Sequence, residues 1–476
     1  MSGDSTGQHD GNYPADTIVA LATAPGKSGI GIIRLSGANS LKIAESIGAA
    51  QLQPRTAKFG NFTSAVKNSN TCAEKIAEPE VIDSGISLYF PQPNSFTGED
   101  VVEIQAHGSP VTLKRLIREC LALGARLAEP GEFSQRAFLN GRIDLTQAEA
   151  IADLIASGSE SAARAATKSL EGIFSNIVNG IANQAVELRK YVEASIDFAE
   201  EEIDFFSDGK IEKAIIKIAE DVGDCLEEGR RGQKLLDGLS LVILGAPNAG
   251  KSSLLNYFSG TDRAIVTGIA GTTRDTLSET IDLDGLAVTI TDTAGLNAHP
   301  DAVEEIGIKR AIQSATAADH LLIMFDASKD SGESSLELLE KYQPGLQQEV
   351  SISLIANKID LSGDQEGLWS EQDKLAIFGT SLKQSRGVKE LTQHLKDIAG
   401  LTDTEPAFSA RTRHIHALES AQEHIQSSLS LLLNEQAGEL IAEELKGAHL
   451  KLQSITGVFS TDDLLGEIFS SFCVGK

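Results

Sequence analysis

A short apolar run that ends in a glycine-rich loop narrows the possible folds of this chain at once. Leu241–Leu244 is followed by residues 245–253, which read G-A-P-N-A-G-K-S-S, and then by a helical pattern. In such a strand–loop–helix unit the backbone N–H groups turn toward phosphates, Lys251 neutralises them and Ser252 ligates magnesium. The motif therefore predicts a phosphate site with contacts from Asn248, Ala249, Gly250, Lys251, Ser252 and Ser253.

Three further motifs indicate which nucleotide base the phosphate site accepts. An Asp-Thr-Ala-Gly element at 292–295 can reach magnesium through water and sense the γ-phosphate. Asn-Lys-Ile-Asp at 357–360 ends in a carboxylate that can accept hydrogen bonds from guanine N1 and N2, which adenine cannot supply. Together with Ser-Leu-Lys at 381–383, these motifs predict a GTP-binding domain with contacts from Asp292, Thr293, Ala294, Gly295, Asn357, Lys358, Ile359, Asp360, Ser381, Leu382 and Lys383.

The sequence departs from many GTPases at the catalytic positions. Leu296 stands directly after the Asp-Thr-Ala-Gly element, where glutamine often orients the attacking water. No arginine finger is evident either, so positive charge must come from another source. Asn248 can hold a monovalent cation against the phosphates; the alternative is that it only caps the loop. A threonine of the following loop can complete the magnesium shell, and composition leaves Thr272 and Thr273 as alternatives.

The hydrophobic pattern divides the chain into four segments and predicts a multidomain α+β protein. Residues 1–136 mix strands and helices, and residues 137–237 have helical periodicity. Residues 238–400 alternate strands with helices, which predicts a Ras-like α/β domain with a mostly parallel sheet. Residues 401–476 are helical again, so the α/β domain is predicted to be inserted into a helical bundle.

Charge and composition exclude several classes of protein. The net charge is −27, which argues against a chain that grips nucleic acid through its own basic face. No run reaches the roughly 18 apolar residues of a membrane span, and the polar N-terminus lacks a signal pattern, so we expect a cytoplasmic protein without a membrane association. The four cysteines are far apart in the sequence, which excludes a compact zinc or disulfide framework.

Beyond these motifs the chain resembles the MnmE (TrmE) family of tRNA-modification GTPases. The resemblance rests on residues 16–20 (D-T-I-V-A), 97–103 (T-G-E-D-V-V-E), 130–134 (P-G-E-F-S) and 136–153, which contain R-A-F-L-N-G-R-I-D-L. The last four residues, Cys-Val-Gly-Lys, are similar to the C-x-G-K terminus of the family. Residues 1–14 have no family counterpart.

The resemblance implies a function and a set of partners. It implies a potassium-activated GTPase that modifies carbon five of the wobble uridine in certain tRNAs to the carboxymethylaminomethyl or aminomethyl form. It further implies a folate one-carbon unit, carried as formyl-tetrahydrofolate, and an N-terminal domain that binds it and forms a homodimer. The partner it implies is a basic, FAD-binding flavoprotein of the MnmG (GidA) kind, joined in a heterotetramer, through which most of the tRNA contact is made.

The resemblance also assigns residues. It implies Glu304 and Cys473 as catalytic residues, and Arg34, Glu103, Arg142 and Lys476 as folate contacts. It implies Ser252 and Thr273 as magnesium ligands, and Asn248, Thr267, Ile269 and Thr272 as potassium ligands. The GTP contacts it adds lie in one loop: Thr267, Gly268, Ile269, Ala270, Gly271, Thr272 and Thr273.

Two other functions fit parts of the sequence. A regulatory GTPase of ribosome assembly would have no substrate chemistry, and the folate-type residues with terminal Cys473 argue against it. A folate enzyme that acts alone, with GTP as an effector, would need its own redox cofactor, and the sequence has no flavin or nicotinamide fingerprint.

Overall fold

The computed structural model describes most of the chain in two compact units. One unit contains residues 1–149 and 456–476, and the other contains residues 150–455. The division of the chain into four segments remains a prediction. In the structure, residues 456–476 group with the N-terminal residues 1–149. The residues that the structure describes are 16–49, 51–64, 79–197, 209–245, 248–260, 278–292, 318–329, 350–372, 375–399, 406–434, 437–458 and 462–475.

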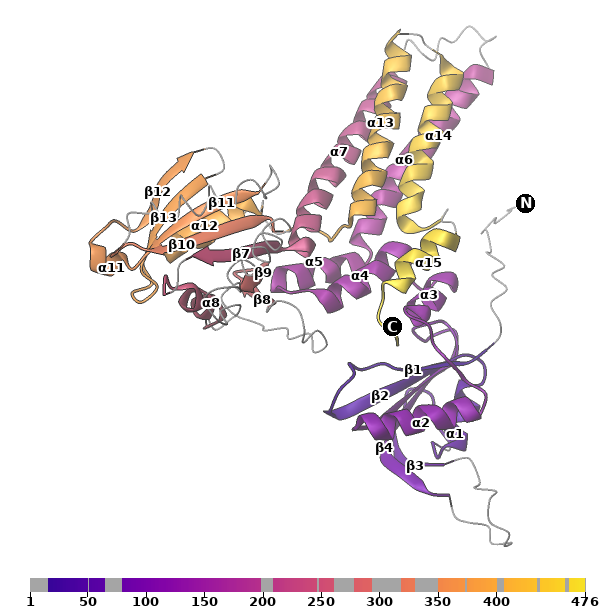
Figure 1. The fold of residues 1–476 in the computed structure, drawn as a ribbon. Coiled ribbons are helices and arrows are strands. Elements are labelled where there is room, and N and C mark those ends of the chain that lie inside the picture. Colours follow the sequence, from indigo (N-terminus) through magenta and orange to yellow (C-terminus); the bar gives the residue numbers. More distant parts are fainter. Residues whose placement is uncertain are drawn as a thin grey trace, which may run out of the picture. The chain divides into compact units, whose positions relative to one another are not determined.

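The first unit is built on a six-stranded sheet with the order β3-β4-β5-β2-β1-β6 (Figure 1). Its strands are β1 (Ile18–Leu21), β2 (Ser28–Ser36), β3 (Lys58–Thr63), β4 (Val81–Phe90), β5 (Val101–Gly108) and β6 (Arg126–Leu127). Its first helices are α1 (Ser40–Ser46), α2 (Pro110–Ala122) and α3 (Glu132–Leu139). The unit ends in α15 (Asp462–Ser470), while α4 (Leu145–Ala156) and α14 (Gly438–Thr456) each cross the division between the units.

The side chains of β2 point alternately to the two faces of the sheet, and only one of these faces lies against the apolar core. Ile33 and Leu35 are buried with Leu113 and Leu116 of α2. Because successive side chains of a strand point to opposite faces, Arg34 lies on the other face. The sheet therefore separates an apolar layer under α1 and α2 from a face that carries charged side chains.

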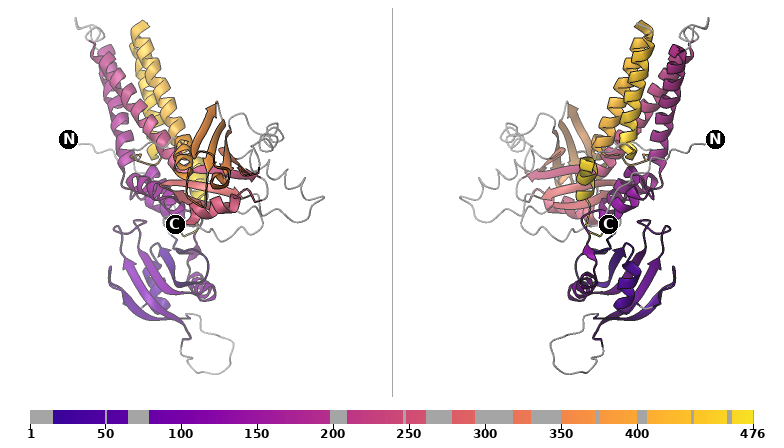
Figure 2. Two further views of the ribbon diagram at one scale, coloured as in Figure 1. Left: turned by 90° about the vertical axis from the view of Figure 1, so that its left-hand side faces the viewer. Right: turned by 90° about the vertical axis from the view of Figure 1, so that its right-hand side faces the viewer.

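The second unit combines long helices with a seven-stranded sheet. Its helices α5 (Glu160–Leu170), α6 (Ile173–Asp197), α7 (Lys210–Asp237), α13 (Thr412–Asn434) and α14 precede and follow the sheet in the sequence. Helices α6, α7, α13 and α14 run side by side (Figure 2). Their common core contains Phe174, Ile215, Leu418 and Leu445, and the Phe174 ring stacks on Phe408 at 4.5 Å between centroids. Segments about 200 residues apart thus form one bundle, as the periodicity predicts.

The sheet of this unit has the order β12-β13-β11-β10-β7-β9-β8. Its strands are β7 (Leu239–Gly245), β8 (Ser278–Leu283), β9 (Leu286–Asp292), β10 (His320–Asp326), β11 (Ser351–Asn357), β12 (Gly367–Gln372) and β13 (Leu375–Thr380). Helix α8 (Lys251–Gly260) follows β7, α11 (Ile359–Ser362) follows β11, and α12 (Val388–Ile398) follows β13. The five inner strands are parallel, and the edge strands β8 and β12 are antiparallel.

Both faces of the inner strands are buried, which explains their continuous apolar sequences. Leu241 and Ile243 of β7 lie in the core that includes α8 and α12, while Val242 and Leu244 lie in a second core on the opposite face. The prediction of a multidomain α+β protein with a mostly parallel nucleotide-domain sheet is confirmed. Within the described residues, no helix is both long enough and apolar enough to span a membrane.

Candidate functional site

The phosphate loop begins and ends at glycines that no other residue can replace without strain. Gly245 ends β7 with φ 147°, and Gly250 has φ 114° directly before α8. A Cβ atom on Gly250 would collide with the side-chain amide of Asn357, and one on Gly245 would collide with the carbonyl of Met324. The glycine positions therefore reflect both backbone conformation and the close approach of neighbouring strands.

Asn357 ties the phosphate loop to the base-recognition loops. Its buried Nδ2 donates to the carbonyl of Ala249 at 2.8 Å, and its Oδ1 accepts from the N–H of Leu382 at 3.4 Å. Three segments far apart in the sequence are thereby held by one amide at the carboxyl end of β11. This is where ligands bind in open parallel sheets.

Lys358 forms a second connection between the same loops. Its Nζ donates to the carbonyl of Asn248 at 2.9 Å and pairs with the Asp326 carboxylate at 2.6 Å. The hydrogen bond from Lys358 is the main cause that lowers the pKa of Asp326, so this carboxylate stays ionised. Sequence reasoning missed Asp326, although it is a carboxylate at the end of the buried strand β10, a position that often faces a ligand in such sheets.

Asp360, the expected guanine contact, is oriented by a residue of the last loop. Its Oδ1 accepts a hydrogen bond of 2.7 Å from Ser381 Oγ. Within the described part of the chain the second carboxylate oxygen accepts no hydrogen bond, so it remains able to accept from a base. The predicted elements at 357–360 and 381–383 thus meet in space.

A cavity of about 770 Å³ lies where these loops meet, and it is large enough for a nucleotide. Its lining residues, which include most of the predicted phosphate and base contacts, are Asn248, Gly250, Lys251, Ser252, Ser253, Asn256, Tyr257, Asn357, Lys358, Asp360, Leu361, Leu382 and Lys383. Lys251 Nζ donates to the carbonyl of Gly245 at 2.7 Å across the loop. Asn256, Tyr257 and Leu361 were not predicted, and they lie within one or two helical turns of predicted residues.

Several predicted residues lie outside the described part of the chain. They are Thr267, Gly268, Ile269, Ala270, Gly271, Thr272 and Thr273 of one loop, Thr293, Ala294, Gly295 and Glu304 of another, and Lys476 at the end. Asp292 ends β9, but its side chain is not described. The assignments of these residues stay predictions.

A separate polar site lies on the open face of the first unit. The Arg34 guanidinium pairs with the Glu103 carboxylate at 2.9 Å across neighbouring strands β2 and β5, which place the two residues in register. The guanidinium also lies 5.7 Å and 5.8 Å from the ring centroids of Phe96 and Phe133. Two of the four predicted folate contacts are therefore direct neighbours, and both are partly exposed.

Arg142 belongs to the loop after α3 and is exposed. A Cβ atom on Gly98 would lie 3.3 Å from the Arg142 side chain, so the aliphatic stem of the arginine runs along the Gly98 backbone. Asn140 holds the two loops together by donating to the carbonyl of Thr97 at 2.7 Å. Arg142 is thus positioned by the loop that also carries Phe96.

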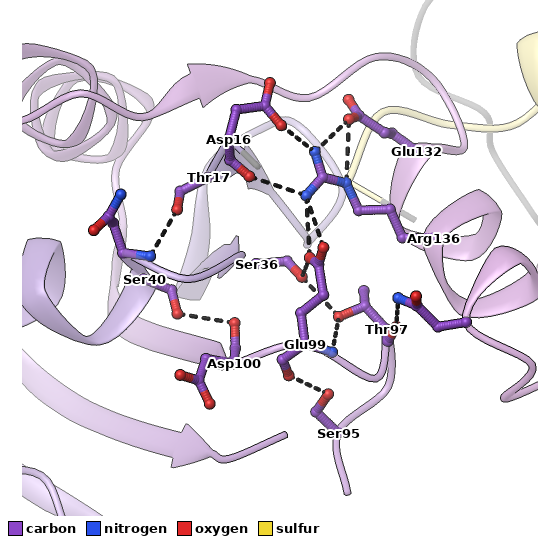
Figure 3. A network of polar contacts seen from close by, with 12 residues as sticks. Asp16, Thr17, Ser36, Ser40, Ser95, Thr97, Glu99, Asp100, Glu132 and Arg136 are labelled. Carbon is purple, nitrogen blue, oxygen red and sulfur yellow. Dashed lines mark hydrogen bonds and ion pairs between the residues drawn. The ribbon is translucent and has the colours of Figure 1, made fainter. Parts of the chain in front are cut away.

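A buried ion-pair network supports this face from below (Figure 3). Arg136 is 4% exposed and donates to Asp16, Glu99 and Glu132 at distances between 2.8 and 3.3 Å. Burial pushes the pKa of Asp16 and Glu132 upward, but hydrogen bonds from Arg126 and Arg136 outweigh it and hold both pKa values below the ordinary range. Residues 16, 97–99, 132 and 136, which carry the family resemblance, serve here as scaffold.

The C-terminal tail lies on the same unit. Val474 forms a β-bridge with Pro130, and the N–H of Gly131 donates to the carbonyl of Cys473 at 3.4 Å. Gly475 has φ 96°, and a Cβ atom there would collide with the carbonyl of Leu21. Cys473 itself is exposed, whereas burial raises the pKa of the Cys120 and Cys225 thiols to about 12.

Comparison with known proteins finds relatives that match nearly the whole chain. Residues 145–473 match the family model described as the MnmE helical domain, and residues 17–142 match the model described as the GTP-binding protein TrmE N-terminus. The tRNA modification GTPase MnmE of Marinomonas sp. (strain MWYL1) is 48% identical over 97% of this chain and 98% of its own length. The protein of the same name from Ectopseudomonas mendocina (strain ymp) is 47% identical over 98% of this chain and 100% of its own length.

Proposed function

The chain belongs to the MnmE (TrmE) family of tRNA modification GTPases, and from this premise we propose how its two sites divide the chemistry. The protein binds and hydrolyses GTP, and this hydrolysis is linked to tRNA modification. We propose that the 770 Å³ cavity is the GTP site and that the Arg34–Glu103 site binds a folate one-carbon carrier. The reaction we propose is modification of carbon five of the wobble uridine.

The residues around the cavity fit a guanine nucleotide with magnesium. Lys251 and Ser252 would hold the phosphates and the metal, which supplies charge neutralisation at the γ-phosphate. Asp360, held by Ser381, would accept from the guanine edge. Asn357 and Lys358 would keep the phosphate and base loops at a fixed spacing, and both line the cavity as predicted nucleotide contacts.

Potassium activation is proposed from the conformation of Asn248. This residue has φ 63°, is exposed, and offers its backbone carbonyl to Lys358. Asn248 also lines the 770 Å³ cavity, where its side-chain oxygen would hold the cation beside the phosphates. Thr267, Ile269 and Thr272 would supply the remaining oxygens, Thr273 would join Ser252 at magnesium, and Glu304 would position the attacking water.

The folate proposal is carried by the Arg34–Glu103 pair. A guanidinium can meet a folate carboxylate, and a carboxylate can accept from the pterin amine. The two aromatic rings beside Arg34 offer apolar surface for a flat ligand. Arg142 and the tail residue Lys476 would add charge, and Cys473, which is exposed on this unit, would act in the modification step.

We further propose a cytoplasmic homodimer that joins a basic FAD-binding protein of the MnmG kind in a heterotetramer. The net charge of −27 supports this division, because most tRNA contact then falls to the basic partner. A regulatory GTPase of ribosome assembly is the second candidate, and the charged site at Arg34 and Glu103 is the observation against it.

One experiment separates the proposed activities. GTP hydrolysis by the full chain is measured in potassium and in sodium, and tRNA nucleosides are analysed after deletion and after complementation with Arg34→Ala. We expect hydrolysis to be fast only in potassium, and Arg34→Ala to abolish the wobble modification while hydrolysis continues. Equal rates in the two salts contradict potassium activation, and normal nucleosides with Arg34→Ala contradict the folate site.

Glu304 needs its own test, paired with its neighbour. Single-turnover hydrolysis in potassium should fall by roughly 10² to 10⁴-fold in Glu304→Ala, as when a water-positioning group is lost. Glu305→Ala should stay close to the unmodified rate, because the sequence predicts a helix after Pro300 and adjacent helical residues point about 100° apart. If instead Glu305→Ala slowed hydrolysis and Glu304→Ala did not, the water-positioning role would belong to Glu305.

A further inference from the structure

A second cavity of the first unit belongs to neither site. It has a volume of about 390 Å³ and lies between α2, the ends of β1 and β6, and the loop that holds Pro25 and Gly26. Helix α2 packs on the face of the sheet that carries Ile33 and Leu35, whereas Arg34 lies on the opposite face. The cavity is therefore separated from the Arg34–Glu103 site by the sheet itself.

The walls of this cavity are almost entirely apolar. They are formed by Leu21 of β1, Leu127 of β6, and Leu113, Ile117 and Leu121 of α2. Leu127 is 54% exposed, so a leucine at the lip of the cavity stands open to solvent. Gly26 has φ 146°, and no atom approaches the space where its side chain would be, which leaves the mouth of the cavity open.

Two basic residues line the same cavity. Lys114 and Arg118 lie four residues apart on α2, so they share one face of the helix with Ile117 and Leu121. Both are exposed, and neither has an ion pair within the part of the chain that the structure describes. The acidic residues nearby are engaged elsewhere, because Glu80 pairs with Arg115 and Glu119 accepts from Ser64.

We propose that this cavity, named here the α2 groove, binds a small amphipathic anion in solution, with an aliphatic or aromatic body and one carboxylate or sulfonate head. The volume lies in the range of small-molecule sites, which are mostly apolar with a few placed polar groups. The apolar body would cover Leu127, Ile117 and Leu121. The head would stay at the rim beside Lys114 and Arg118, because burying a charge away from water is costly.

The charges argue against two other occupants. Twofold pairing of this face with a second copy of the chain would bring two basic pairs toward each other. A nucleic acid would find only two cations beside apolar walls, while its affinity depends on many phosphate contacts.

The test uses n-alkanoates as probes of the full-length protein. Titration calorimetry with hexanoate, octanoate and decanoate should show affinity rising about 4-fold for each added methylene, as expected for apolar burial. Decyltrimethylammonium, which has the same chain with the opposite charge, should bind at least about 10-fold more weakly than decanoate. Equal binding of the two decyl compounds, or no dependence on chain length, overturns the proposal.

Substitutions of residues that line the groove test whether decanoate binds there. Combined Lys114→Glu and Arg118→Glu should weaken decanoate roughly 10-fold, since two exposed ion pairs become repulsive. Lys42→Glu, an exposed charge reversal on α1, should have no effect. Leu127→Asp should also weaken decanoate, and as an exposed position it should fold normally. Decanoate binding unchanged by all of these variants overturns the proposal.

Two further measurements test whether the α2 groove instead binds a membrane surface or a second copy of the chain. Sedimentation with phosphatidylglycerol vesicles should leave the protein in solution, and vesicle binding without decanoate binding would assign the groove to a membrane surface. Light scattering should give the same mass with and without decanoate. A mass that halves on adding decanoate would show that the groove holds a second copy of the chain, which contradicts the proposal.

Discussion

Within the four residues Asn357–Asp360, three side chains connect the loops around the cavity by hydrogen bonds. Asn357 and Lys358 bind backbone carbonyls of the phosphate loop, so they hold two loops at a fixed distance. Asp360 is turned by Ser381 toward the cavity. In the proposed GTP site we therefore expect Asp360 to accept from the guanine edge, while Asn357 and Lys358 hold the surrounding loops in place.

Replacing Asp360 with asparagine should change the base that the protein selects. Asp360→Asn should lower GTP affinity and raise xanthosine triphosphate affinity, because unpaired buried polar groups can cost up to about 10⁴-fold in such sites. Asp364→Asn is the control, since Asp364 is exposed and, among the described residues, accepts only from Ser362. Equal ATP and GTP affinity of the unmodified protein, measured with fluorescent nucleotides, would contradict this role.

Arg136 differs from Asp360 because it is buried and its guanidinium is held in ion pairs with three carboxylates. Arg136→Met would remove the arginine partner of Glu99 and leave Asp16 and Glu132 paired only with Arg126. Removing one partner of a buried ion pair costs about 3–5 kcal/mol, so we expect the first unit to unfold at much lower denaturant concentration. Arg115→Met removes an exposed pair with Glu80 and should matter little.

The same variant should change the response to acid. The folded pKa values of Asp16 and Glu132 are lowered, so their contribution to stability is present above the unfolded pKa values and is lost as the pH falls through the folded ones. Arg136→Met should therefore unfold with a shallower dependence on pH below about pH 4. An equal acid dependence in both proteins, followed by circular dichroism, would contradict this account.

At the scale of elements, strands of the nucleotide domain connect the site to the rest of its unit. The hairpin β8–β9 is attached to α5, because Asp282 accepts from the N–H of Glu160 at 3.1 Å. A Cβ atom on Gly238, at the end of α7, would collide with the carbonyl of Ala287 on β9. The hairpin that carries the Asp292 element is thereby fixed to α5 and to the end of α7.

The first residue of β10 makes this sheet sensitive to pH. His320 is buried, and its ring lies 2.6 Å from Ser351 Oγ and 3.0 Å from Ser353 Oγ. Burial, with a smaller effect of His394, lowers the pKa of His320 to about 3. The ring is therefore neutral in the folded state, whereas it binds a proton near pH 6.5 when the chain is unfolded.

We expect the stability of the nucleotide domain to be complete above pH 6.5 and to fall as the pH drops from 6.5 toward 3. The slope for one such group approaches about 1.4 kcal/mol per pH unit. Urea unfolding at pH 7.5, 6.0 and 5.0 should show this slope, and His320→Gln should reduce it. His416→Gln, at an exposed position, should leave it unchanged. A slope that survives in His320→Gln would show that another group titrates.

At the scale of the whole molecule, the last residues of the chain return to its first domain. The tail contacts Pro130, Gly131 and Leu21, which all belong to the unit that carries Arg34 and Glu103. Folate binding and tail placement should therefore be coupled, whereas GTP hydrolysis should not depend on the tail.

Gly475→Ala tests this coupling with a single methyl group. The new Cβ atom would strain a backbone with φ 96° and collide with Leu21, so the tail should detach. We expect weaker formyl-tetrahydrofolate binding by calorimetry, similar to removal of residues 473–476, with GTP hydrolysis nearly intact. Gly124→Ala is the matched control, because its φ of 100° is similar but no atom lies near the added methyl group. Unchanged folate affinity in Gly475→Ala and in the truncated chain would contradict the coupling.

Local patterns predicted the nucleotide site well because its residues act through adjacent backbone. The spacing of Gly245, Gly250 and Lys251 specifies a strand, a turn and a helix start, and the structure has them at β7 and α8. The periodicity likewise predicted a bundle made of two separated segments. The family, and with it the link to tRNA modification, also followed from contiguous motifs.

Only the tertiary structure decided which distant residues share a task. Arg34 and Glu103 are 69 residues apart and meet through strand register, and Lys358 reaches across 110 residues to the phosphate loop. Asp326 and the α2 groove gave no local signal, because neither a lone strand-end carboxylate nor a helix stripe shows in sequence what packs beside it. Local propensity acts over a few residues, whereas these contacts depend on how sheets and helices stack, and that information is spread over the whole chain.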